Sequence, residues 1–222
     1  MKRIILMFVA IMMTTLSAQA QIPVNVKGIL KKCDAKMSSY NDGSGVVIDA
    51  KLKMKVSVLT INGTMKSYIK NQKYFNLLSL TAMGEEVMKM ELGFDGEQEW
   101  VYESEPDGKS KDSLTITKTK NAQNEFGMRS DYDKEYKKAK MKEVGRYYEI
   151  TFSEPKKKDI PKKATIKIDK ESYIMREYSI AQNVGMFSGN IAITITKITK
   201  GCSDKWLKLD MSRYKNAAVV RK

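Results

Sequence analysis

The sequence predicts a mainly β protein of the α+β class, built around one long antiparallel sheet. Apolar and polar residues alternate from Val46 to Val58. Several shorter alternating segments follow, separated by turn signals, and only two stretches have helical spacing. Together these patterns predict about nine to eleven strands, with two or more helices on the concave side of the sheet.

The segment from Val46 to Val58 is the element around which the other strands are expected to assemble. Successive strand side chains point to opposite faces, so a period of two predicts one apolar and one polar face. Asn62-Gly63 is typical of a tight hairpin turn, and Asp95-Gly96 predicts a later turn. Further strands are predicted over Met65–Lys70, Tyr74–Thr81, Met88–Phe94 and Gln98–Glu103, which completes an antiparallel meander.

The apolar inner face of this meander is the candidate binding surface. Either the chain's own helices or an apolar ligand must cover it, because exposed apolar area is unfavourable in water. Several of its residues are methionines, which are flexible and recur on surfaces that accept varied apolar partners; ordinary core packing is the alternative. The residues expected on this face are Val46, Ile48, Leu52, Met54, Val56, Met65, Ile69, Met88, Met90, Leu92, Phe94, Trp100 and Tyr102.

Residues 1–20 have the pattern of a secretory signal peptide. Lys2 and Arg3 precede an apolar run, and Ala18-Gln19-Ala20 is a small-residue cleavage site. The run is too short to span a bilayer. We therefore expect a periplasmic protein whose mature chain starts at Gln21 and forms a single domain over residues 21–222. Because residue 21 is not a cysteine, lipidation is not expected.

The remaining segments predict two helices and the later strands. Val26, Ile29, Leu30, Cys33 and Met37 recur at helical spacing before the turn signal Asn41-Asp42-Gly43. Phe126, Tyr132, Tyr136 and Ala139 predict a second amphipathic helix within residues 121–140. Later strands are predicted to contain Leu114–Thr117, Tyr148–Phe152, Ala164–Ile168, Tyr173–Ala181 and Ile191–Ile195, and the tail Trp206–Val220 a last short strand or turn.

The two cysteines permit one disulfide, between Cys33 and Cys202, in an oxidising compartment. Cys33 lies on the apolar side of its predicted helix, so a buried free thiol is the alternative. The sequence does not decide between the disulfide and the free thiol.

Residue types argue against catalysis. The chain has no histidine, which removes the commonest general base and the usual metal ligand. It also has no glycine-rich phosphate loop, GxSxG motif or CxxC motif. We therefore expect a protein that is not an enzyme and that needs no metal or cofactor.

The charge is strongly basic. Forty Lys and Arg residues against 26 Asp and Glu residues give a formal net charge of +14. In an exported protein this favours an acidic envelope protein or an anionic membrane surface over nucleic acid. Because the lysines alternate with apolar residues rather than cluster, a solvated outer face is the alternative explanation.

Three segments resemble the LolA-like family of periplasmic carriers of outer-membrane lipoproteins. They are Tyr68–Phe75, Phe94–Tyr102 with its Asp95-Gly96 and Trp100-Val101-Tyr102, and the tail Leu207–Val220. The chain departs from the family at Lys70–Phe75, which lacks the carriers' proline and final arginine, and at Lys215, where proline is common. The resemblance implies an unclosed antiparallel β half-barrel with helices on the concave face, which binds lipid acyl chains there.

Two functions follow from these observations. The first is a periplasmic carrier that holds a lipid acyl chain or lipoprotein on the apolar inner face. The second is a regulatory or scaffold protein that uses the same half-barrel to bind another envelope protein.

Overall fold

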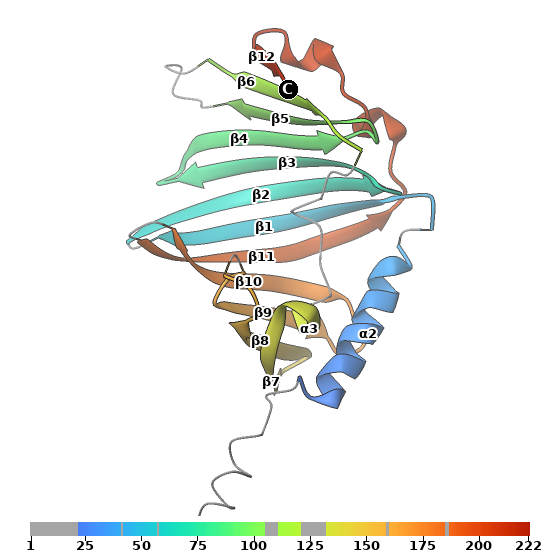
Figure 1. Ribbon diagram of the computed structural model, residues 1–222, viewed down its shortest axis with the longest axis vertical. Helices are drawn as coiled ribbons and strands as arrows, with labels where there is room; N and C mark the ends of the chain where they lie inside the picture. Colours follow the sequence, from blue (N-terminus) through green and yellow to red (C-terminus); the bar gives the residue numbers. More distant parts are fainter. Residues whose placement is uncertain are drawn as a thin grey trace, which may run out of the picture.

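A single sheet of twelve strands organises the computed structural model of the protein (Figure 1). The structure describes residues 22–40, 42–56, 58–104, 111–120, 132–158, 160–184 and 187–222. The predicted signal peptide, Gln21 and the predicted helix start at 121–131 lie outside these ranges. The strands are β1 Val46–Val56, β2 Leu59–Lys70, β3 Lys73–Ala82, β4 Glu85–Phe94, β5 Gln98–Ser104, β6 Ser113–Lys118, β7 Tyr136–Val144, β8 Tyr147–Pro155, β9 Lys163–Asp169, β10 Met175–Val184, β11 Phe187–Lys200 and β12 Ala218–Arg221.

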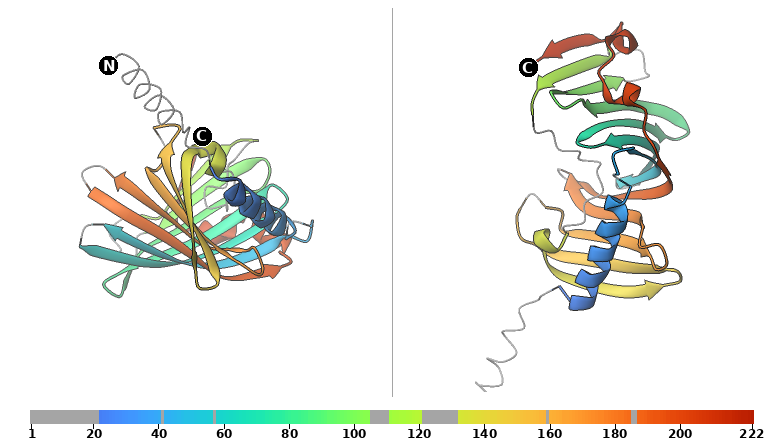
Figure 2. Two further views of the ribbon diagram at one scale, coloured as in Figure 1. Left: turned by 90° about the horizontal axis from the view of Figure 1, so that it is seen from below. Right: turned by 90° about the vertical axis from the view of Figure 1, so that its right-hand side faces the viewer.

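The sheet is open. Its strand order is β12-β6-β5-β4-β3-β2-β1-β11-β10-β9-β8-β7, so β12 and β7 are edges at opposite ends of the molecule (Figure 1). Seen along the stack, the strands fan out through a large twist without closing into a barrel (Figure 2). The predicted unclosed half-barrel is therefore confirmed. The tail adds one feature that the sequence did not specify, because β12 pairs with β6 in parallel.

Different elements cover the two faces of the sheet. We call the face that carries the helices α2 (Val24–Ser38) and α3 (Tyr132–Glu135) the helix face. The opposite face carries the 3₁₀ turns η1 (Asp204–Leu207) and η2 (Met211–Tyr214) of the C-terminal segment, and we call it the tail face. The covers are also displaced along the sheet: α2 and α3 lie by β7–β10, and the C-terminal segment by β2–β6 (Figures 1 and 2).

The largest core lies under α2. Val26, Leu30 and Cys33 recur every three or four residues, so they share one side of the helix and are buried. They pack against strand residues including Ile150 and Ile166, which are fully buried. The predicted first helix is thus confirmed, and its apolar side faces the sheet.

The tail face has an aromatic core. Trp206 stacks on Tyr68, with ring centroids 4.8 Å apart, and on Phe75 at 6.0 Å. The guanidinium of Arg213 lies 4.8 Å from the Phe75 ring centroid and pairs with Glu91 at 3.0 Å. These contacts hold the C-terminal segment against β2, β3 and β4.

The predicted hairpin turn at Asn62-Gly63 is wrong. Both residues lie inside β2, and the chain reverses before Leu59, near Val58. Gly63 pairs with Leu52 and Leu80, and a Cβ atom there would lie 2.7 Å from Leu80 Cδ2 and from the Ser79 carbonyl oxygen. The glycine therefore provides space for Leu80 within the sheet, and turn chemistry does not explain it.

The second predicted helix is also wrong over most of its described length. Only Tyr132–Glu135 is helical, and Tyr136–Val144 is the edge strand β7. Tyr132 and Tyr136 both reach Phe152, at ring-centroid distances of 5.0 and 5.8 Å. The helical spacing of the two tyrosines arises because one lies in a short helical turn and the other begins the strand that follows it.

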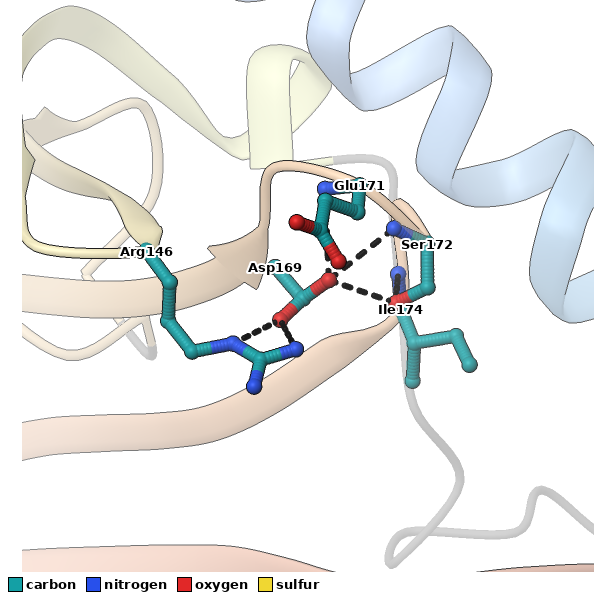
Figure 3. Close-up of polar contacts among 5 residues, drawn as sticks. All are labelled: Arg146, Asp169, Glu171, Ser172 and Ile174. Atoms are coloured by element: carbon teal, nitrogen blue, oxygen red, sulfur yellow. Dashed lines mark hydrogen bonds and ion pairs between the residues drawn. The ribbon is translucent and has the colours of Figure 1, made fainter.

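A buried carboxylate ties the turns at one end of β7–β10 together (Figure 3). Asp169 is 1% exposed and accepts hydrogen bonds from Arg146 Nε at 2.6 Å and from the backbone N–H of Ser172 at 2.9 Å. It also accepts from the Ser172 hydroxyl at 2.9 Å and the Glu171 N–H at 3.2 Å. The ion pair with Arg146, aided by these donors, holds the pKa of Asp169 well below its usual range.

Candidate functional site

The strand register places most of the predicted inner-face residues on the helix face. Directly paired strand residues share a face of the sheet, and so do alternate residues of one strand. Leu52 pairs through Gly63 with Leu80, which pairs with Met88, and Ala50 connects in the same way to Met90. The predicted residues that these rows bring together are Val46, Ile48, Leu52, Met54, Met65, Ile69, Met88, Met90, Leu92 and Phe94. Val56 pairs with Leu59, and its side chain lies outside the described part.

Trp100 and Tyr102 belong to the tail face, so their prediction as inner-face residues is wrong. The turn at Asp95-Gly96 pairs Phe94 with Glu99, and consequently Trp100 pairs with Gly93. Trp100 is 1% exposed and lies in the tail-face core, and Tyr102 packs against that core. A shift of one residue in the register reverses the face of every side chain in a strand, and no sequence pattern in this turn specified the register.

Residues that the sequence analysis did not assign to the site complete this face. Ile61, Leu78 and Leu80 come from β2 and β3 through the pairs just described. Ile191 and Ile193 come from β11 by pairing with Met54 and Leu52, and Ile180 pairs with Ile191. The alternation of Ile191, Ile193 and Ile195 indicated a strand, but only the pairing of β11 with β1 places it beside the first hairpin.

Burial is uneven along this face. At one end, Tyr74 and Phe94 are 2% exposed. Toward the β1–β2 turn Leu52, Met65 and Leu80 are still buried, but the other large apolar side chains described there are only half-buried. We call these residues the apolar strip: Met54, Ile61, Leu78, Met88, Met90, Ile180, Ile191 and Ile193. Among the described residues, the strip joins neither the core under α2 nor the core under the C-terminal segment, except for Ile180, which packs at the margin of the α2 core.

A buried polar position lies beside the strip. Ser67 pairs with Ile48 on one side and with Asn76 on the other, and both Ser67 and Asn76 are 2% exposed. The Ser67 hydroxyl has no hydrogen-bond partner among the described residues. A buried hydroxyl without a partner is costly, and the amide side chain of Asn76 on the neighbouring strand shares this buried position with Ser67.

The two thiols are not bonded. Cys33 is 1% exposed in the core under α2, whereas Cys202 packs at the margin of the tail-face core. The two cores lie on opposite faces of the sheet, which separates the sulfurs. Burial raises the pKa of the Cys33 thiol to about 12, with Asp34 contributing, so Cys33 is a protonated core residue.

The described residues contain no group of three or more His, Cys, Asp or Glu side chains that could hold a metal ion. None of the helices in the described ranges is long and apolar enough to cross a membrane.

The protein therefore has an open half-barrel fold with one partly uncovered apolar face. No protein-family model matches the chain, and no curated protein matches its sequence. Solved structures are similar at low identity. An uncharacterised conserved protein from Thermus thermophilus is 10% identical, with 89% of this chain and 99% of that chain covered and a TM-score of 0.49.

Two further structures carry more specific names. A LolA superfamily protein from Nitrosomonas europaea is 9% identical, with 83% and 98% of the two chains covered and a TM-score of 0.39. MucB of Pseudomonas aeruginosa, solved in complex with MucA, is 8% identical, with 87% and 63% covered and a TM-score of 0.42. The similar structures thus include a protein of the superfamily that the sequence segments resemble.

Proposed function

We propose that this protein is a periplasmic binding or carrier protein that holds a lipid acyl chain, alone or as part of a lipoprotein, on the apolar strip. The division of the helix face supports this. Over β7–β10, α2 and α3 bury the apolar side chains, whereas the strip leaves apolar side chains from six adjacent strands half-exposed. Contiguous apolar surface of this kind typically marks a binding site.

The length of this surface suits one acyl chain. The apolar strip crosses six adjacent strands from β4 to β10, which is five strand spacings or about 24 Å. One leaflet of a bilayer, which one acyl chain spans, is about 15 Å thick in its hydrocarbon part. An acyl chain that lies across the strands would therefore be covered along its length.

The chemistry of the surface suits the same ligand. Its methionines can adapt to a flexible chain, and each buried CH₂ contributes about 0.8 kcal/mol. Burying about ten CH₂ groups gives roughly 8 kcal/mol, which corresponds to micromolar binding.

Lipid extraction and native mass spectrometry of protein purified without detergent test this proposal. We expect acyl-containing species to copurify with the wild type and at least a tenfold loss for Met90→Asp, because a carboxylate would be desolvated against the chain. Thr64→Asp is the matched control, since Thr64 is exposed on the tail face of β2, two strands from Met90.

The outcomes separate the candidate functions. A folded Met90→Asp variant that retains the wild-type amount of lipid would refute the role of the strip. A wild-type protein that is free of lipid but retains another envelope protein would favour a regulatory or scaffold function.

A further inference from the structure

Two neighbouring hairpins end in apolar residues that are exposed to solvent. Val58, at the β1–β2 turn, is 100% exposed, and Met83, at the β3–β4 turn, is 94% exposed. Leu59 and Val87 flank them and are 40% and 41% exposed. We call these four residues the hairpin-tip patch. Side chains as exposed as Val58 and Met83 add nothing to the core, so packing does not explain their apolar character.

The two tips point the same way. β2 pairs with β3 through Ile61 and Ala82, which places both turns at one end of the sheet (Figure 1, left). Hairpins related in this way are two strand spacings apart, or about 10 Å. The apolar strip begins directly behind them, with Met54 and Ile61. An apolar surface thus continues from the tips onto the helix face.

The charge next to the tips is basic. Lys51, Lys53 and Lys55 lie on the tail face of β1, which leads into the first tip, and all three are exposed. Among the described residues they form no ion pair. Their partners across β2 and β11 are Thr64, Asn62, Thr60, Thr194, Ala192 and Asn190, none of which is acidic.

Among the described residues, the acidic residues near the tips are Glu85 and Glu86 of the second tip and Glu103 of β5, which pairs with Met90. Glu86 pairs with Lys89 at 3.0 Å and accepts a hydrogen bond from Ser79, so its charge is largely compensated. Glu85 is exposed. Three lysines without an ion pair against the two exposed carboxylates of Glu85 and Glu103 leave the described part of the tip region with an excess of positive charge.

We propose that the hairpin-tip patch docks on an anionic lipid bilayer. Val58 and Met83 enter the head-group region, while Lys53 and Lys55 contact lipid phosphates. Apolar side chains next to basic residues are the combination that binds anionic membrane surfaces, since burial of the apolar groups adds to the electrostatic attraction. Docking in this orientation would place the end of the apolar strip at the membrane surface. The contact itself requires no bound acyl chain.

Vesicle cosedimentation of the full mature chain tests the docking. The vesicles consist of phosphatidylcholine with phosphatidylglycerol, or of phosphatidylcholine alone. We expect the wild type to bind the anionic vesicles more tightly than the neutral ones. Each lysine near an anionic surface contributes about fivefold, so Lys53→Glu combined with Lys55→Glu should weaken binding at least tenfold. Val58→Ser combined with Met83→Ser should have a similar effect without a change in charge.

Val144→Ser is the matched control. Val144 is 43% exposed at the β7–β8 hairpin, at the opposite end of the strands, so its substitution should leave vesicle binding unchanged. Wild-type protein that binds neither vesicle, or double variants that bind as tightly as the wild type, would overturn the proposal. So would wild-type dimers that both double variants convert to monomers, because the tips would then bind a second copy. Lipid extraction from the same preparations reports separately on the acyl-chain site.

Discussion

The close contact between Gly93 and Trp100 allows a quantitative test of the tail-face register. Trp100 pairs directly with Gly93 across β4 and β5, and its indole ring covers the glycine. A Cβ atom at Gly93 would lie 2.6 Å from Cη2 of the ring and closer still to Cζ2 and Cε2. Non-bonded carbon atoms pack at about 3.5–4.0 Å, so Gly93→Ala requires the ring to move by about 1 Å or more.

The ring has little room to move. Trp100 is 1% exposed and stacks on Phe75 with centroids 6.0 Å apart, in a core that the C-terminal segment closes. Overpacking of a core costs about 1–3 kcal/mol, and complete loss of a buried tryptophan about 3–5 kcal/mol. We expect Gly93→Ala to lower the free energy of unfolding by about 3 kcal/mol. For a chain of this size that lowers Tm by about 6–12 °C.

Thermal unfolding monitored by circular dichroism measures the effect. Gly28→Ala is the matched control: Gly28 lies within α2, and a Cβ atom there meets nothing within 4 Å. This control should raise stability by about 0.5–1 kcal/mol, because alanine favours the helix. Trp100→Leu provides a second check, since Gly93→Ala should cost much less once the ring is absent. If Gly93→Ala melts at the wild-type temperature, the indole does not cover Gly93 and the register of β4 with β5 is wrong.

Three further predictions concern polar side chains and the two thiols. Asp169→Asn should lower Tm at neutral pH. Because the folded-state pKa of Asp169 is lowered, the stabilisation from its carboxylate is complete above the unfolded pKa of about 3.9 and is lost as the pH falls below that value. The difference in Tm between the variant and the wild type should therefore shrink in acid. An unchanged difference from pH 7 to pH 2 would contradict this. Tyr214→Phe removes a hydrogen bond of 2.6 Å from the hydroxyl to Glu91 and should cost about 1–2 kcal/mol in urea unfolding, with no loss of lipid retention. Iodoacetamide at pH 8 should label Cys33 only after unfolding and Cys202 sooner, and a reducing agent should leave Tm unchanged; a fall in Tm on reduction would indicate a disulfide.

The sequence was most informative where one periodicity extends over many residues. The alternation that begins at Val46 predicts β1 and its buried side correctly, because an eleven-residue strand in the middle of a sheet has only one way to bury its apolar set. The spacing of Val26, Leu30 and Cys33 predicts α2 for the same reason. In both elements local pattern and burial agree.

Predictions from two or three residues were less reliable. Asn62-Gly63 is typical of a turn, yet Gly63 lies inside β2, where a side chain at this position would collide with Leu80. Tyr132 and Tyr136 have helical spacing, yet β7 must pair with β8 at the edge of the sheet, and that pairing outweighs a weak local preference. Both errors arise because tertiary contacts determined the conformation of a short segment.

The candidate site depends on a property that periodicity cannot supply, namely which apolar face each strand shares with its neighbours. Met90 and Trp100 both lie in alternating apolar segments, but the turn at Asp95-Gly96 sends them to opposite faces. The two residues consequently have different surroundings. Trp100 packs in the core that the C-terminal segment closes, whereas Met54, Met88 and Met90 remain half-exposed on the helix face. Trp100 stacks with other rings under a permanent cover, whereas Met54, Met88 and Met90 are flexible side chains that can repack around an exchangeable ligand, and this difference supports placing the proposed site on the apolar strip.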